Sequence, residues 1–262
     1  MRESSSSLAG LRRRVARIAA SGASSGPATA GALASGHAGF DAALGGGLAV
    51  GRVHELFAAD MLDAASAAAF AAMLALRAGG EAPLLWLRPA DAERKAGRLY
   101  APGLAEIGGD PNRMLLVETG DARALLAAAN DAVRCAGSAA VVVESHGRLP
   151  AFDLTAGRRL ALGAREAGTT LILLRIAAEP VPSVAETRWR VAAAPSRDLE
   201  AGAPGAPAFD LELLRWRAGP AGACWRLEWN RDEQAFRDAA LSGAGLSLAP
   251  RRALEPRGAA AA

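Results

Sequence analysis

Short apolar runs alternate with longer amphipathic stretches along the middle of the chain. The runs LLWL at 84–87 and AAVVVES at 139–145 carry no polar alternation, which is typical of strands buried on both faces. Helical patterns lie between the runs, and this order indicates βαβ units and a parallel sheet. The predicted strands span 53–57, 84–87, 114–118, 139–145 and 170–176, and the predicted helices span 64–78, about 91–106, 122–135 and 153–168.

The pattern changes in the C-terminal third. TRWRVAAA at 187–194 is strand-like, and FDLELLRWR at 209–217 and ACWRLEWN at 223–230 flank the connection AGPAG. Such a pair predicts a β-hairpin with aromatic cross-strand contacts. We expect a short helix after it. The predicted fold class is therefore α/β, with a mostly parallel central sheet and a C-terminal antiparallel hairpin.

The two ends of the chain differ from this domain. Leu8, Leu11, Val15 and Ile18 recur at helical spacing among arginines, so residues 1–20 are predicted to form a basic amphipathic helix. Residues 21–32 (SGASSGPATAGA) have the composition of a flexible linker. Residues 33–242 are predicted to form the domain, and residues 243–262 a disordered tail.

Composition limits the classes of protein to which this chain can belong. The chain has 262 residues, a net charge of +3 and 51% hydrophobic residues, but its apolar runs are too short to span a membrane. The N-terminus is a poor signal peptide because arginines interrupt its apolar positions. Two cysteines, Cys135 and Cys224, make no disulfide framework, which favours a reducing cytoplasm. Lys95 is the only lysine.

The stretch GRVHELFAADMLDAAS at 51–66 has the strand–turn–helix order of a phosphate loop. A working loop reads G-x-x-x-x-G-K-[ST]: its glycines let amides curl around phosphate, its lysine neutralises phosphate, and its hydroxyl holds magnesium. The glycine positions fall on Ala58 and Asp63, the lysine position on Ala64 and the hydroxyl position on Ala65. We expect Asp60 and Asp63 to cap the helix N-terminus instead and to repel phosphate.

Several strings in this order resemble the RecA-type ATPase core. They are GFDAALGGGLAVGRVHEL at its entry, LYAPGLAEIGGDPNRMLLVE, AAVVVES at the Walker B strand, and the late strands ETRWRV and FDLELLRWR. The resemblance covers roughly residues 33–232. Within the superfamily, the LGGGL entry, the alanine-rich helix without a phosphate loop, LYAPGL, DLTAGRRL and ETRWRV most resemble the ImuA family. That family is RecA-like and SOS-inducible, and is encoded with ImuB and an error-prone C-family polymerase.

The resemblance implies a RecA-like core with a degenerate phosphate loop. It further implies a non-catalytic accessory protein of the SOS mutasome that supports translesion synthesis, without cofactor or metal. The implied partner is an ImuB-type Y-family polymerase homologue, with RecA and the C-family polymerase as further partners. The implied location is the cytoplasm, at the nucleoid during DNA damage. Two alternatives stay open: a divergent RecA-like DNA-dependent ATPase, and a cell-division inhibitor of the SulA type.

Other candidate residues follow from the same reading. Glu144 takes the Walker-B-like position, and the turn RPAD after Leu87 aligns no water-activating glutamate, although Asp91 or Glu93 could lie near that position. The three histidines are far apart in sequence, which predicts no metal site. Several arginines form a candidate partner surface that also allows weak, non-specific contact with DNA phosphates: Arg12, Arg13, Arg17, Arg148, Arg188, Arg190, Arg215 and Arg217.

Overall fold

The computed structural model describes residues 31–79, 82–135, 137–138, 140–197, 199–200, 203 and 205–239. The predicted N-terminal helix, residues 21–30 of the predicted linker and the predicted C-terminal tail lie outside this set. The first described strand, β1 (Ala32–Leu33), pairs with β2 (Leu48–Ala49). The first described strand therefore begins at the last residue of the predicted linker, next to the predicted start of the domain at residue 33.

The main sheet of the described residues has nine strands in the order β11-β10-β9-β8-β3-β7-β6-β4-β5. The strands from β8 to β5 are parallel, and β9, β10 and β11 continue the sheet in antiparallel fashion. This confirms the predicted mostly parallel sheet with its C-terminal hairpin. The bounds are β3 (Val53–Ala58), β4 (Leu84–Pro89), β5 (Met114–Thr119), β6 (Ala140–His146), β7 (Thr170–Ile176), β8 (Thr187–Ala193), β9 (Ala208–Trp216), β10 (Cys224–Asn230) and β11 (Ala235–Asp238).

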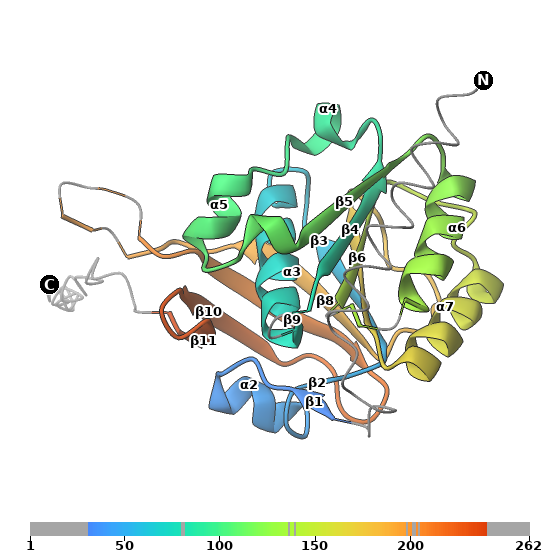
Figure 1. Cartoon of the computed structure of the whole chain (residues 1–262). Coiled ribbons are helices and arrows are strands. Elements are labelled where there is room, and N and C mark those ends of the chain that lie inside the picture. The colour runs from blue at the N-terminus through green and yellow to red at the C-terminus, as the bar shows by residue number, and fades with distance from the viewer. Residues whose placement is uncertain are drawn as a thin grey trace, which may run out of the picture.

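Helices cover both faces of the parallel part of the sheet (Figure 1). α3 (Ala64–Gly79) packs on one face, and α6 (Ala122–Val133) and α7 (Leu154–Ala167) pack on the other. β6 and β7 are buried between these layers, which explains why their sequences read as continuous apolar runs. α2 (Ala38–Ala43) places Phe40 against Trp189 and Trp225, so the entry segment closes the hairpin end of the core.

The helix predicted over about 91–106 is two helices. α4 (Ala92–Ala96) ends at Gly97, and α5 (Ala101–Glu106) begins four residues later. Gly97 has φ 85° and ψ 177°, a backbone region that is open to glycine and closed to other residues, so the chain turns there. The correction matters for function because the turn faces a cavity described below.

The helix predicted after the hairpin is wrong as well. The chain turns at Asn230, whose side-chain oxygen accepts hydrogen bonds from the backbone N–H groups of Asp232 and Glu233. It then returns as β11, which pairs antiparallel with β10 and buries Phe236 against Trp229. A side-chain-stabilised turn followed by cross-strand aromatic packing outweighs the local helical pattern.

Candidate functional site

Parallel strands bring their carboxyl ends to one edge of the sheet, where α/β proteins place their ligands. β3 ends at Ala58 and leads through residues 59–63 into α3. Ala64 and Ala65, at the lysine and hydroxyl positions of a phosphate loop, form the first turn of this helix. Leu62, in the turn before them, is 89% exposed. The edge thus has a strand–turn–helix order with alanines at the start of the helix.

The two carboxylates of this turn bind backbone amides in a different way from the predicted helix cap. Asp60 Oδ1 accepts from the N–H groups of Leu62 at 2.6 Å and Asp63 at 3.2 Å. Asp63 Oδ1 accepts from the N–H of Ala193, at the end of β8, at 2.7 Å. Asp60 therefore fills the concave side of the turn, and Asp63 fastens it to the neighbouring strand. The predicted capping of the first helical turn by Asp63 is corrected accordingly.

Glu144, at the Walker-B-like position, lies buried near the end of β6. Its Oε2 accepts from Trp86 Nε1 at 2.9 Å, and its Oε1 lies 2.8 Å from His146 Nε2. These two contacts fix the carboxylate between β4 and the end of its own strand. The sequence pattern predicts Glu144 as a site residue but gives no role to Trp86 or His146.

Charged groups next to this edge are engaged with one another. Arg88, at the end of β4, donates to Glu118 Oε1 through Nε at 3.1 Å and Nη2 at 2.9 Å. Lys95 lies 2.7 Å from Asp91 Oδ2, and this hydrogen bond lowers the pKa of Asp91. Glu93, which sequence analysis placed beside Asp91 near the water-activating position, accepts from Arg98. The end of β4 thus carries an arginine directly before its last residue, Pro89.

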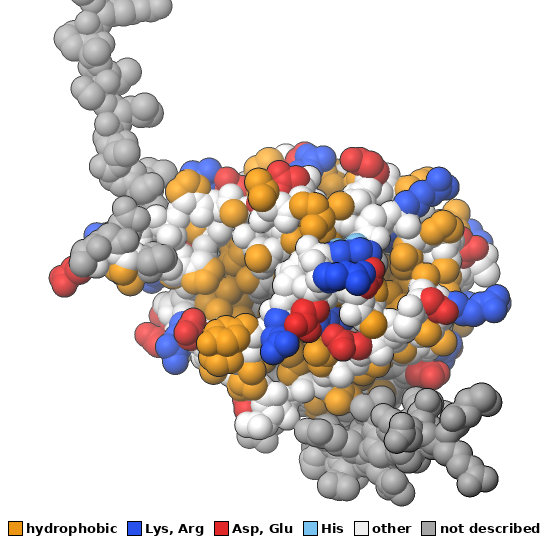
Figure 2. All heavy atoms as spheres, turned by 90° about the horizontal axis from the view of Figure 1, so that it is seen from above, with side chains coloured by type: hydrophobic (Ala, Val, Ile, Leu, Met, Phe, Trp, Pro, Cys, Tyr) orange, Lys and Arg blue, Asp and Glu red, His pale blue; other side chains and the backbone are white. Residues whose placement is uncertain are grey.

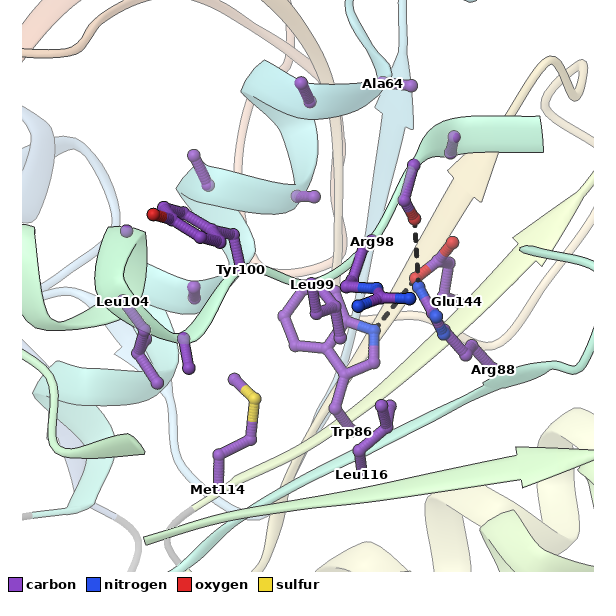
Figure 3. Close-up of a pocket in the computed structure, with 18 of the residues that line it drawn as sticks. Ala64, Trp86, Arg88, Arg98, Leu99, Tyr100, Leu104, Met114, Leu116 and Glu144 are labelled. Atoms are coloured by element: carbon purple, nitrogen blue, oxygen red, sulfur yellow. Dashed lines mark hydrogen bonds between the residues drawn. The ribbon is translucent and has the colours of Figure 1, made fainter. Parts of the chain in front are cut away.

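A cavity of about 460 Å³ opens beside these groups, between α3, α5 and strands β4 and β5. Figure 2 shows hydrophobic side chains gathered around a hollow on the face seen from above. In the close-up, Trp86 lies on the sheet, Tyr100 lies across the cavity beside α3, and Glu144 and Arg88 share one end (Figure 3). Alanines of α3 form one wall: Ala64, Ala65, Ala68, Ala69 and Ala72.

Arg188 is 9% exposed, so the prediction that it belongs to a surface is wrong. Its partner in the sheet register is Glu55 on β3, and Arg188 Nε donates to Glu55 Oε2 at 2.7 Å. Ser183 Oγ donates to the same oxygen at 2.9 Å. The pair is an ion pair inside the fold that ties β3 and β8 to the loop between β7 and β8.

Arg215 and Arg217 support the same loop. Arg215 Nη1 donates to the carbonyl oxygen of Ser183 at 3.0 Å, and Arg217 Nη1 donates to that of Val184 at 3.4 Å. Arg148 and Arg190 are exposed, and Arg190 on β8 pairs with Glu212 on β9. Arg12, Arg13 and Arg17 lie outside the described residues. Of the predicted surface arginines that the structure describes, Arg148, Arg190 and Arg217 are therefore exposed, Arg215 is half-buried and Arg188 is buried.

Two further observations bear on the class of site. Within the described part of the chain, no group of three or more His, Cys, Asp or Glu side chains is arranged to hold a metal ion. None of the helices described here is both long enough and apolar enough to cross a membrane.

Comparison with known proteins decides the family. The chain is 34% identical over 207 residues to Protein ImuA of Caulobacter vibrioides strain NA1000, covering 70% of this chain and 77% of that protein. The same values hold for Protein ImuA of strain ATCC 19089. The chain belongs to the ImuA family. It is thus a RecA-like protein associated with SOS mutagenesis, as the strings LGGGL, LYAPGL and ETRWRV indicated.

A solved structure supports the fold of this ImuA-family chain independently. The chain superposes on the crystal structure of the RadB recombinase with a TM-score of 0.52 at 15% sequence identity, and the match covers 79% of this chain and all of the RadB chain. At this identity the likeness establishes the RecA-like fold alone. No family model matches the chain.

Proposed function

We propose that this ImuA-family protein is a non-catalytic RecA-like accessory of the SOS mutasome. It binds an ImuB-type Y-family polymerase homologue and thereby supports translesion synthesis by the error-prone C-family polymerase. RecA is a further partner in this scheme. The observation that carries the non-catalytic role is the Asp60 carboxylate, which occupies the amides of the former phosphate loop.

The geometry of the turn supports loss of the nucleotide site. A phosphate loop binds anions because several backbone N–H groups converge on an open concavity. Here two of these N–H groups already donate to Asp60, and Asp63 adds a second negative charge. A phosphate would have to break those hydrogen bonds and approach two carboxylates without the lysine and hydroxyl that stabilise it elsewhere.

Among the described residues near the turn, the charged groups that could replace the lost chemistry are engaged with one another. Lys95 and Arg88, the basic residues that could stand in for the lost lysine, pair with Asp91 and Glu118. Asp91 and Glu93 are themselves held by Lys95 and Arg98, so neither is a free base for activating water. A fold that keeps the core and lacks these groups is suited to binding other proteins.

The partner surfaces in this proposal are the predicted N-terminal helix and the C-terminal hairpin with the tail beyond it. The hairpin and the neighbouring strand β8 supply exposed charges: Arg190 on β8 pairs with Glu212 on β9, and Arg226 on β10 pairs with Asp210 on β9. These pairs are exposed, so they contribute to partner selectivity more than to stability.

The test is titration of the full chain with a fluorescent ATP analogue and magnesium, with and without single-stranded DNA. RecA under the same conditions is the positive control. We expect no saturable signal at high micromolar protein, together with co-purification of the ImuB-type partner. Saturable, magnesium-dependent binding would contradict the non-catalytic role, and failure to co-purify the partner would contradict the adaptor role.

A further inference from the structure

Arg175 is a buried arginine with which none of the described residues forms an ion pair. It lies near the end of β7, it is 6% exposed, and its Nε is buried without a hydrogen-bond partner. No carboxylate oxygen in the described part of the chain lies within 4.0 Å of its guanidinium nitrogens. An arginine keeps its charge in proteins, and a buried charge is costly unless a hydrogen-bonding group of opposite charge accompanies it. The side chain therefore needs an acceptor beyond those that the described residues supply.

The buried groups around Arg175 do not supply that acceptor. Glu55 on β3, the strand between β7 and β8, is engaged by Arg188 on β8, whose Nε lies 2.7 Å from Glu55 Oε2. The hydroxyl of Ser183 donates to the same oxygen at 2.9 Å. Burial lowers the pKa of the Arg175 guanidinium, and this effect is larger than the opposing effect of Glu55. Because both arginines stay protonated, the buried groups on these three strands carry an excess of positive charge whatever the protonation of Glu55.

A small cavity lies against Arg175, between the start of α7 and the loop that joins β7 to β8. Its volume is about 20 Å³, which accommodates one water-sized group, since a water molecule needs roughly 10–15 Å³. Asp153 also lines the cavity, but it is exposed to solvent and its Oδ1 accepts from the N–H of Ala156 at 2.8 Å, as the N-cap of α7. Leu154 and Val181, two further lining residues, are 42% and 44% exposed. The cavity therefore lies close to the surface, where a small solute can reach it.

We propose that this cavity binds a small monovalent anion of the size of chloride, held by the guanidinium group of Arg175. A chloride ion is little larger than a water molecule, and it accepts N–H hydrogen bonds without donating any, so it suits both the space and the donors. A phosphate or sulfate group has four oxygens around a central atom and does not fit a space for one water-sized group. The bound anion links β7 to the start of α7 and to the loop that Arg215 also holds, through the carbonyl oxygen of Ser183.

The test measures the line width of the chlorine NMR signal of sodium chloride in solutions of the full chain, because exchange of chloride with a protein site broadens that line. We expect a broadening that saturates with chloride and that sodium bromide reverses. Sodium sulfate at the same ionic strength should leave the broadening unchanged, because the tetrahedral anion does not fit. Absence of a saturable broadening would assign the space to water and overturn the proposal, and so would equal displacement by sulfate.

Substitutions place the binding in this cavity. Arg175→Met removes the guanidinium group and should weaken chloride binding at least tenfold, whereas Arg165→Met, at an exposed position of α7 outside the cavity, should leave it unchanged. Gly157→Ala retains Arg175 but adds a Cβ at 3.3 Å from Val184 Cγ2, in the cavity lining, and should weaken chloride by narrowing the space. Alanine is a better helix former than glycine, so this variant should fold. Chloride affinity that survives Arg175→Met would overturn the proposal; if that variant does not fold, unchanged affinity in Gly157→Ala would do so.

Thermal unfolding gives a second readout, because an anion that binds the folded chain alone raises its melting temperature. We expect a higher melting temperature in sodium chloride than in sodium gluconate at equal ionic strength, since gluconate is too large for the cavity. The difference should disappear in Arg175→Met and persist in Arg165→Met. Equal melting temperatures of the unsubstituted chain in the two salts would contradict the proposal. Neither salt contains a nucleotide or a protein partner, so both results are independent of the accessory role proposed above.

Discussion

His54 is a buried histidine whose hydrogen bonds suit the neutral ring. Its Nε2 lies 2.9 Å from the carbonyl oxygen of Ala49, so Nε2 is the donor, and its Nδ1 lies 2.8 Å from Thr187 Oγ1. That hydroxyl already accepts from Trp189 Nε1 at 2.7 Å and has its own proton to donate to Nδ1. Burial lowers the pKa of His54 to about 4, against a smaller opposing effect of the Ala49 carbonyl.

This arrangement predicts acid sensitivity. The unfolded chain takes up a proton on His54 near pH 6.5, whereas the folded chain does so only near pH 4. The free energy of unfolding should therefore fall as the pH drops through this window, by about 3 kcal/mol from His54 alone. His54→Gln should remove most of that slope. Urea unfolding at pH 7 and pH 4.5 measures it, and identical slopes for both proteins would contradict the assignment.

Arg188 and Arg190 lie on the same strand, but we expect their substitution to change the free energy of unfolding by different amounts. Arg188→Met leaves the buried Glu55 carboxylate without its cation and should cost about 3–5 kcal/mol of unfolding free energy. Arg190→Met breaks an exposed pair with Glu212 and should cost about 1 kcal/mol or less. Chemical denaturation of both variants gives the comparison. Similar costs would show that Arg188 does not act inside the fold.

The residues that occupy the phosphate-loop positions can be predicted from the sequence alone, because the apolar strand at 53–57 fixes the alignment with the loop motif. The cavity does not follow from it. Trp86 reads as an ordinary strand residue and Tyr100 as a helix-start residue, and only the turn at Gly97 brings them together. The role of Asp63 was also beyond sequence, because its partner Ala193 lies 130 positions away.

Between α4 and α5, one glycine determines how the elements meet. The φ of 85° and ψ of 177° at Gly97 cost other residues about 1–3 kcal/mol. Gly97→Ala should therefore destabilise the protein by about that amount, although a methyl group there would meet no atom within 4 Å. Gly120→Ala, at an equally open position without a positive φ, should be near neutral. Thermal unfolding of both variants separates backbone strain from steric contact.

Strands with continuous apolar runs could be predicted from the sequence, because a strand that is buried on both faces needs apolar side chains at successive positions. β6 and β7 match their predicted ranges to within one residue at each end. Elements that depend on distant contacts were not: β11 follows from pairing with β10, and β1 follows from pairing with β2. The local spacing of apolar residues carries no information on either pairing. The sequence therefore favoured a helix where β11 forms.

The chain divides into the described domain and terminal segments that lie outside the described residues. The two apolar clusters are built from residues between Leu33 and Phe236, on either face of one sheet. Residues 1–20, which carry the basic amphipathic pattern, lie outside the described residues from which these clusters are built. We therefore predict that the described domain determines the free energy of unfolding, and that the N-terminal segment contributes to partner binding.

Deletion of residues 1–20 tests this division. It should leave the free energy of unfolding within about 1 kcal/mol, because the core residues are retained. It should weaken capture of the ImuB-type partner at least tenfold, because it removes one of the two proposed surfaces. Leu11→Asp with Val15→Asp keeps the chain length and should weaken capture similarly, since it disrupts the apolar stripe. Capture that survives both changes would leave the C-terminal hairpin as the partner surface.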